Sequence, residues 1–175
     1  IPTGLAISAD GKKLYVAGNL GNQLHELDAT SGKVLRSWDT GVAPQDVVLV
    51  GGKAYVSNRG GRRPGSGDLT ALAGKGTSVR VDPVRHIASE GSVSVIDLSS
   101  AGTTAGPQTE ILTGLHASAL ALTPNGRWLV VANAGSDTLS VLDTRTDRIV
   151  ETIGMRQNPA DLFGAQPNAL AFDPS

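Results

Sequence analysis

Asn-Gly-Arg-Trp-Leu-Val-Val-Ala-Asn-Ala-Gly-Ser-Asp-Thr-Leu-Ser-Val-Leu-Asp-Thr, residues 125–144, is the stretch that decides the fold. Its first two residues accept the positive φ of a tight turn. An apolar run at residues 128–132 follows, and a polar reversal separates it from a second run at 139–142. Two short strands joined by a tight polar turn form a β-hairpin. One hairpin cannot bury an apolar face alone, so the unit must recur or dock against another element.

The hairpin unit recurs twice more along the chain. Its copies are residues 10–17 with 24–28, and residues 51–58 with 92–97. Tyr15 and Tyr55, at matching positions, lie 40 residues apart, and Asp97 and Asp143 lie 46 apart. Strand units that recur at intervals of roughly 40–45 residues are typical of β-propeller blades. The spacing therefore predicts a propeller.

The composition favours many short strands and excludes several classes of site. The chain has 175 residues, 22 glycines and only 3% aromatic residues, and no long segment has helical periodicity. A net charge of −1 gives no overall field that would attract nucleic acid or an acidic membrane. The absence of cysteine excludes disulfides, thiolate zinc sites and a cysteine nucleophile. No apolar run approaches the ~18 residues of a membrane-spanning helix.

The order of strands and turns divides the chain into blades. We assign residues 1–40 to blade one, 41–113 to blade two and 114–157 to blade three. Residues 158–175 begin blade four, with one strand expected at 168–172. The prediction is an all-β partial β-propeller of three four-stranded blades plus one strand of a fourth. Because propellers have four to eight blades, we expect a fragment of a longer chain, with an open array that closes by oligomerising as the alternative.

Blade two is interrupted by an insertion at residues 59–90. The insertion is rich in glycine and contains six Lys or Arg residues against three Asp or Glu residues. Arg59, Arg62 and Arg63 lie close together on a glycine-rich loop, and such guanidinium groups suit bidentate binding of phosphate or carboxylate. The alternative is a solvated loop or one that contacts another domain. Insertions within a repeat usually emerge on one face, often the binding face.

The mouth of the central channel is a second candidate site. The loops that enter the innermost strands of a propeller gather there, and here they present Asp46, His116 and Asn168. Such a ring of groups can hold a metal, a sugar or an anion; the alternative is that these side chains cap loop backbones or face solvent. The three histidines have no metal-ligand spacing, and no calcium-loop or nucleophile-elbow motif is present. We therefore predict no catalytic residue, metal or cofactor in this chain.

The repeats resemble a known family. Tyr-Val-Ala at 15–17, Tyr-Val-Ser-Asn at 55–58 and Val-Val-Ala-Asn at 130–133, each paired with Val-Ser-Val-Ile-Asp or a variant, resemble the YVTN (YncE-like) repeat of seven-bladed β-propellers. This resemblance covers nearly the whole chain. A narrower resemblance, at residues 58–64, 81–83 and 91–97, is to the propeller half of bacterial proteins in which YncE-like repeats precede an alkaline-phosphatase-like phosphoesterase domain.

The resemblance carries expectations of its own. It implies a ring of seven blades, the remaining blades and a C-terminal phosphoesterase domain as partners, and an exported, periplasmic or cell-surface protein of bacteria. We expect this chain to be a non-catalytic scaffold for ligand binding or docking. A lactonase-type hydrolase acting at the channel mouth and a surface adhesion or interaction module are the alternatives. The repeats do not separate these functions, because one fold hosts many.

Overall fold

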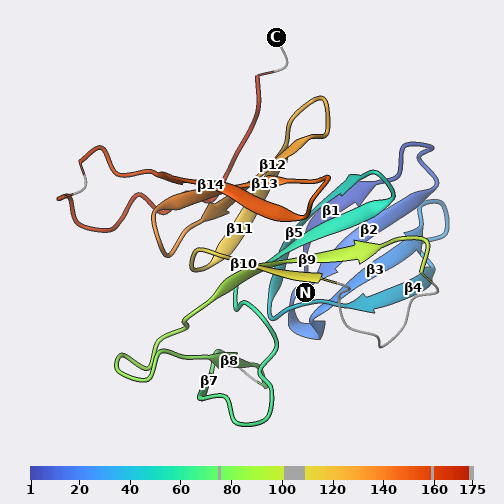
Figure 1. Ribbon diagram of the computed structural model, residues 1–175. Helices are drawn as coiled ribbons and strands as arrows, with labels where there is room; N and C mark the ends of the chain where they lie inside the picture. The colour runs from blue at the N-terminus through green and yellow to red at the C-terminus, as the bar shows by residue number, and fades with distance from the viewer. Residues whose placement is uncertain (75, 101–108, 159, 174–175) are drawn as a thin grey trace.

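The structure is a computed structural model that describes residues 1–74, 76–100, 109–158 and 160–173. Its strands form three four-stranded antiparallel sheets and one two-stranded sheet (Figure 1). A short 3-10 helix, η1 (Asn19–Gly21), is the one helix in these described ranges. Short strands and tight turns follow from the glycine-rich, alternating sequence. The prediction of an all-β fold is confirmed.

Each large sheet is an antiparallel meander of four strands. The first contains β1 (Pro2–Ile7), β2 (Lys13–Gly18), β3 (Gln23–Asp28) and β4 (Val34–Asp39). The second contains β5 (Pro44–Val50), β6 (Lys53–Asn58), β9 (Gly91–Asp97) and β10 (Thr109–Thr113). The third contains β11 (Ala117–Leu122), β12 (Trp128–Asn133), β13 (Thr138–Asp143) and β14 (Arg148–Gly154). Three such sheets side by side are the blades of a partial β-propeller, as the sequence predicts.

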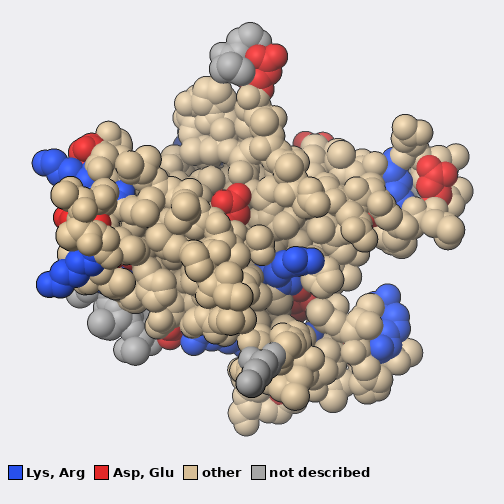
Figure 2. Space-filling model, turned by 180° about the vertical axis from the view of Figure 1, so that it is seen from behind, with Lys and Arg blue, Asp and Glu red and all other residues tan. Residues whose placement is uncertain are grey.

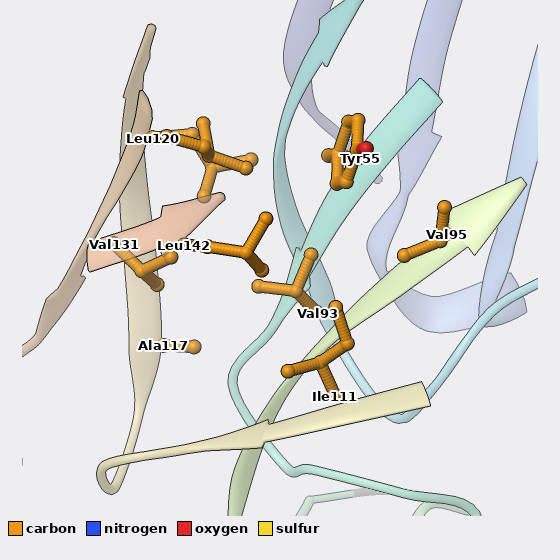
Figure 3. Packing of buried hydrophobic residues seen from close by; sticks show 9 residues of the cluster. Tyr55, Val93, Val95, Ile111, Ala117, Leu120, Val131 and Leu142 are labelled. Atoms are coloured by element: carbon orange, nitrogen blue, oxygen red, sulfur yellow. The ribbon is translucent and has the colours of Figure 1, made fainter. Parts of the chain in front are cut away.

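The second sheet lies between the other two and is buried on both faces. Successive residues of a strand point to opposite faces of a sheet. Tyr55 therefore belongs to the same apolar cluster as Leu120 and Leu142 of the third sheet (Figure 3). Its neighbours in β6, Ala54 and Val56, pack against the first sheet instead. The core of the molecule thus consists of the two interfaces between adjacent sheets.

The outward faces of the first and third sheets retain exposed apolar residues. Leu5 and Ile7 of β1 are 60% and 61% exposed, and Val150 of β14 is 54% exposed. Both faces belong to sheets that are covered on one side within the described part of the chain. The contrast with β6 and β9, which are buried almost throughout, follows from having a neighbouring sheet on each side.

The insertion forms a small lobe that projects from the second sheet (Figure 1). It contains the hairpin of β7 (Thr70–Leu72) and β8 (Ser78–Arg80). Val79 and Val81 pack on Val42, which lies just before β5, and this contact is the centre of the lobe's own apolar cluster. Lys75, counted among the basic residues of the insertion, lies outside the described residues.

The strand predicted at residues 168–172 is not formed. An innermost strand is held by backbone hydrogen bonds from the second strand of its own blade. The described chain offers no such strand to residues 168–172, so they join no sheet. Phe172 instead lines an apolar hollow on the third sheet together with Trp128 and Val130.

Two surface properties bear on possible partners. None of the described helices has the length and apolar character needed to cross a membrane. On the face shown in Figure 2, Lys and Arg side chains stand apart from one another and form no continuous basic surface. Nucleic-acid binding usually depends on such a surface.

Candidate functional site

The innermost strands β1, β5 and β11 lie side by side and begin at the same end of the molecule. A cleft of about 440 Å³ opens at this end. Each strand lines it with its second and third residues: Thr3 and Gly4, Gln45 and Asp46, and Ser118 and Ala119. The remaining lining residues are Arg59, Ala134, Gln166 and Asn168. The cleft is therefore built from equivalent positions of successive repeats, at the mouth predicted for the channel.

Two side-chain hydroxyl groups, one in the first sheet and one in the third, each connect their own sheet to the segment that leads into the next repeat. The Thr3 hydroxyl lies 3.2 Å from the carbonyl oxygen of Ala17, in its own sheet, and 2.9 Å from that of Pro44, in the next. The Ser118 hydroxyl has the same relation to Ala132, at 3.1 Å, and to Pro167, at 3.3 Å. Pro167 thus takes the place that Pro44 has at the start of β5, although no strand follows it.

Asp137 fixes the segment that brings Gln166 and Asn168 to the cleft. Its Oδ2 accepts a hydrogen bond from the Gly164 backbone N–H at 2.6 Å, and its Oδ1 accepts one from the Gln166 N–H at 2.8 Å. These donors favour the charged carboxylate and lower the pKa of Asp137. The result is a short strap, residues 164–168, tied across the mouth.

The sequence contains a signal for Asp137 that the repeat comparison missed. Asn22 holds the same position immediately before the third strand of its sheet, and both residues have a φ of +52°. The Asn22 Oδ1 accepts a hydrogen bond from the Ala43 N–H at 2.9 Å, as Asp137 does from Gln166. Asn and Asp tolerate this left-handed conformation better than other non-glycine residues. Aligning the turns as well as the strands therefore identifies the pair.

Asp46 lies at the cleft, but its carboxylate already bridges two innermost strands. Its Oδ1 accepts a hydrogen bond from the Val47 N–H at 2.8 Å and its Oδ2 accepts one from the Leu120 N–H at 2.9 Å. Burial raises the pKa of Asp46, and the two N–H donors oppose that effect. The approach is close: a Cβ on Gly4 would lie 2.5 Å from the Asp46 Cα. Asp46 therefore holds the frame of the mouth together.

His116 lies beside the cleft and is not among its lining residues. Its backbone has a φ of +56°, and its carbonyl accepts a hydrogen bond from the Ala134 N–H at 3.2 Å. Burial lowers the pKa of His116, and the positive charge of Arg59 lowers it further. Both effects favour the neutral imidazole, and Arg59 lies close enough for its positive charge to act on His116.

The three clustered arginines have three different environments. Arg62 forms a bidentate ion pair with Glu90, with Nε–Oε2 and Nη2–Oε1 distances of 2.9 and 2.5 Å. Arg63 donates from Nε to the Thr40 carbonyl at 2.7 Å. The side chain of Arg59 is exposed and makes no hydrogen bond or ion pair with any residue the structure describes. The three arginines predicted to bind phosphate or carboxylate are therefore not held together. Of the three, only Arg59 lines the cleft at the mouth, with Asp46 and Asn168.

A second polar cluster lies where the insertion leaves and rejoins the second sheet. Glu110 of β10 accepts hydrogen bonds from the Asn58 amide at 3.0 Å, from the Ser94 hydroxyl at 2.8 Å and from the Ser92 hydroxyl. Burial raises the pKa of Glu110, and these donors oppose that effect. Asn58 and Ser92 flank the insertion in sequence. The cluster therefore joins both ends of the insertion to the outer strand, a role that no local sequence pattern indicated.

The cleft at the mouth is lined mainly by uncharged residues. The cleft contains one carboxylate, Asp46, and both of its oxygens accept backbone hydrogen bonds. General acid–base hydrolysis normally needs an acid and a base that are free to exchange protons with the substrate. Within the described residues, no group of three or more His, Asp or Glu side chains is arranged to hold a metal ion.

Comparisons with known proteins agree on the fold. No family model matches the chain, and no curated protein sequence matches it. Hydrazine synthase of Kuenenia stuttgartiensis is similar, with a TM-score of 0.62 and 22% identity over 86% of this chain and 35% of that one. A putative 6-phosphogluconolactonase from Bacteroides fragilis has a TM-score of 0.56 and 20% identity, covering 88% of this chain and 38% of its own. A chain of the mitotic checkpoint complex has a TM-score of 0.59 and 15% identity, covering 86% and 36%.

These neighbours have propeller folds, and they support the partial β-propeller seen here. At such low identity the likeness concerns the fold alone. The chain spans a little over a third of the length of each neighbour. The assignment to the YVTN family stays a prediction from the repeat sequence.

Proposed function

We propose that this protein is a non-catalytic β-propeller module that binds a small polar ligand in the cleft at the channel mouth. The observation that carries the proposal is the convergence of equivalent residues from successive repeats on one cleft of about 440 Å³. This volume lies within the range of about 300–1,000 Å³ that is usual for small-molecule sites. Gln45, Gln166 and Asn168 add amide groups that have no hydrogen-bond partner among the described residues.

Among the described residues that line the cleft there is no free acid–base pair, and this favours binding over hydrolysis. Asp46 is engaged by backbone N–H groups, and His116 lies beside the cleft, outside its lining. A lactonase-type enzyme is the competing function, and it requires lactone hydrolysis that depends on His116. If the intact protein hydrolyses a panel of lactones and His116→Ala abolishes that turnover, the non-catalytic proposal is wrong.

The proposal also includes a larger assembly. The resemblance to YVTN propellers supports a seven-bladed ring, an exported bacterial protein and an accompanying phosphoesterase domain, with the propeller as its docking scaffold. Measuring the mass of the denatured intact protein tests whether such a domain is present. Phosphomonoesterase and phosphodiesterase assays on that protein test its activity, and a lack of both activities contradicts this part of the proposal.

The binding proposal is tested by filling the cleft. Ala134→Trp places a large side chain at the mouth, whereas Ala29→Trp adds the same side chain to an exposed turn at the opposite end of the first sheet. We expect calorimetric titration with a panel of small polar compounds to find saturable binding that Ala134→Trp weakens by about tenfold or more. Ala29→Trp should leave the binding unchanged. Equal affinities in the two variants would place the ligand elsewhere.

A further inference from the structure

The free hydrogen-bonding capacity of the mouth cleft is unevenly distributed between donors and acceptors. The Thr3 and Ser118 hydroxyls are directed to backbone carbonyls, and each oxygen of Asp46 accepts a backbone N–H. The acidic group at the cleft is thus already satisfied by the protein. What remains for a ligand is a set of amide groups and the guanidinium of Arg59.

Arg59 is positioned by the repeat rather than by the insertion. It is the first residue after β6, where Ala134 stands after β12. The Arg59 N–H donates to the Ala43 carbonyl at 3.0 Å, and the Ala134 N–H donates to the His116 carbonyl at 3.2 Å. Equivalent backbone bonds therefore hold both residues at the mouth. The second sheet places a cation at the position where the third sheet has only a methyl group.

The other cations near the second sheet do not compete for this role. Arg62 is bound to Glu90, and Arg63 is bound to the Thr40 carbonyl and to Asp39, with an Nη2–Oδ1 distance of 3.2 Å. A guanidinium group offers five N–H donors in a planar fork that matches carboxylate and phosphate geometry. A free fork at the rim of a polar cleft favours an anion over a neutral ligand.

We propose, on the basis of the binding function above, that the mouth cleft takes a small organic anion whose carboxylate or phosphate pairs with Arg59. The uncharged part of the ligand lies among the amides of Gln45, Gln166 and Asn168. The strap tied by Asp137 supplies two of these three amides. Asp137 is thus a positioning residue for the site, whereas Arg59 contacts the ligand.

The test uses three six-carbon probes that share a polyhydroxylated chain: gluconate, sorbitol 6-phosphate and uncharged sorbitol. Titration calorimetry with the intact protein should find that the two anions bind about tenfold or more tightly than sorbitol. Raising the salt concentration should weaken the binding of the two anions and leave the binding of sorbitol unchanged. A preference for only one anion identifies which group Arg59 recognises.

Variants separate the role of Arg59 from a general effect of charge. Arg59→Ala should lower anion affinity about tenfold or more, and Arg59→Lys should recover only part of it because an ammonium group lacks the fork. Arg85→Ala is the matched control, since Arg85 is exposed and pairs with Asp82 within the insertion. Circular dichroism and thermal unfolding should show that all three variants keep the fold, because the Arg59 side chain has no hydrogen-bond or ion-pair partner among the described residues and the ion pair of Arg85 lies at the surface.

Two results would overturn the inference, and they differ from failure of the binding function itself. Sorbitol binding as tightly as the anions would show a cleft that does not select charge. Anion binding that is equally strong in the wild type and in Arg59→Ala would show that another group holds the charge. In either case the cleft still binds a ligand, whereas no saturable binding of any probe would contradict the proposed function for compounds of this size.

Discussion

The second and third sheets follow the same repeat, but they differ in what connects their second and third strands. β6 ends in Asn58 and β12 ends in Asn133, and both side chains are fully buried. Each donates to a serine of the third strand: Asn58 to Ser94 at 2.8 Å and Asn133 to Ser140 at 2.9 Å. In the third sheet a turn of four residues, 134–137, connects β12 to β13, whereas in the second sheet the insertion of residues 59–90 intervenes.

The outer strands respond to this difference. Ser94 faces Glu110 across the second sheet, and Ser140 faces Thr152 across the third. Glu110 is partly buried with three donors around it, whereas Thr152 is exposed. The hydrogen bond from asparagine to serine is thus common to both sheets, whereas the carboxylate of Glu110 is found only in the sheet that carries the insertion. Four measurements test this contrast, and the expected effects decrease from the first to the last.

The largest loss of stability should come from Gly41→Ala, which adds a methyl group at the start of the second blade. A Cβ on Gly41 would lie 2.5 Å from the Gly61 carbonyl oxygen, an atom of the insertion backbone. A Cβ on Gly114 would meet side chains instead, with Ser136 Oγ at 2.6 Å. We expect denaturant unfolding to show a loss of about 3 kcal/mol for Gly41→Ala and about 1–2 kcal/mol for Gly114→Ala. Equal losses would mean that the insertion backbone is free to move aside.

The second test removes the shared asparagines. Asn58→Ala takes a donor away from the partly buried carboxylate of Glu110, whereas Asn133→Ala removes bonds to neutral hydroxyls only. Hydrogen bonds to charged groups contribute more than neutral ones. Chemical denaturation should give a loss of about 2–3 kcal/mol for Asn58→Ala and about 1 kcal/mol for Asn133→Ala. The reverse order would contradict the special role given to the second sheet.

The third test follows the protonation of Glu110. Burial raises the pKa of this carboxyl in the folded state, so folding favours its protonated form. The resulting stabilisation is complete below the unfolded-state pKa of about 4.3 and is lost as pH rises through the folded value. Glu110→Gln cannot titrate, so its stability relative to the wild type should increase as the pH rises from about 4 through the raised pKa of Glu110.

Thr152→Glu is the matched control for the pH test. It places a carboxyl at the equivalent position of the third sheet, where the residue is exposed. An exposed carboxyl titrates alike in the folded and unfolded states and adds no pH dependence. A flat pH profile for the difference between Glu110→Gln and the wild type would show that folding does not raise the pKa of Glu110.

The smallest effect should separate two arginines of the insertion. Arg62 and Glu90 form an ion pair whose side chains are 39% and 14% exposed, so Arg62→Ala should cost about 0.5–1 kcal/mol. Arg59→Ala should change stability by less than about 0.5 kcal/mol, because its side chain has no described partner. Hydrogen exchange over residues 60–90 should quicken in Arg62→Ala and stay unchanged in Arg59→Ala. Faster exchange in both variants would assign Arg59 a structural role as well.

The candidate site was predictable where it follows the repeat. The position of a residue within its blade identified Asp46 and Asn168 as mouth residues, because entry loops gather at one end of any propeller. The roles of these residues were not predictable. Whether Asp46 offers its oxygens to a ligand depends on the N–H of Leu120, 74 residues away in the sequence. The grouping of Arg59 with Arg62 and Arg63 was likewise a matter of sequence proximity: Arg62 and Arg63 are bound to other protein groups, whereas Arg59 lines the cleft.

The sequence by itself determined the strands of the three four-stranded sheets and the place of the insertion. These follow from the alternation of apolar and polar residues and from turn-forming dipeptides, which act over a few neighbouring residues. Only the tertiary structure decided that residues 168–172 form no strand, that Asp137 ties the strap and that Glu110 accepts hydrogen bonds from both sides of the insertion. Each of these outcomes depends on a partner distant in sequence, because a hydrogen bond or a buried charge is set by what the fold brings beside it.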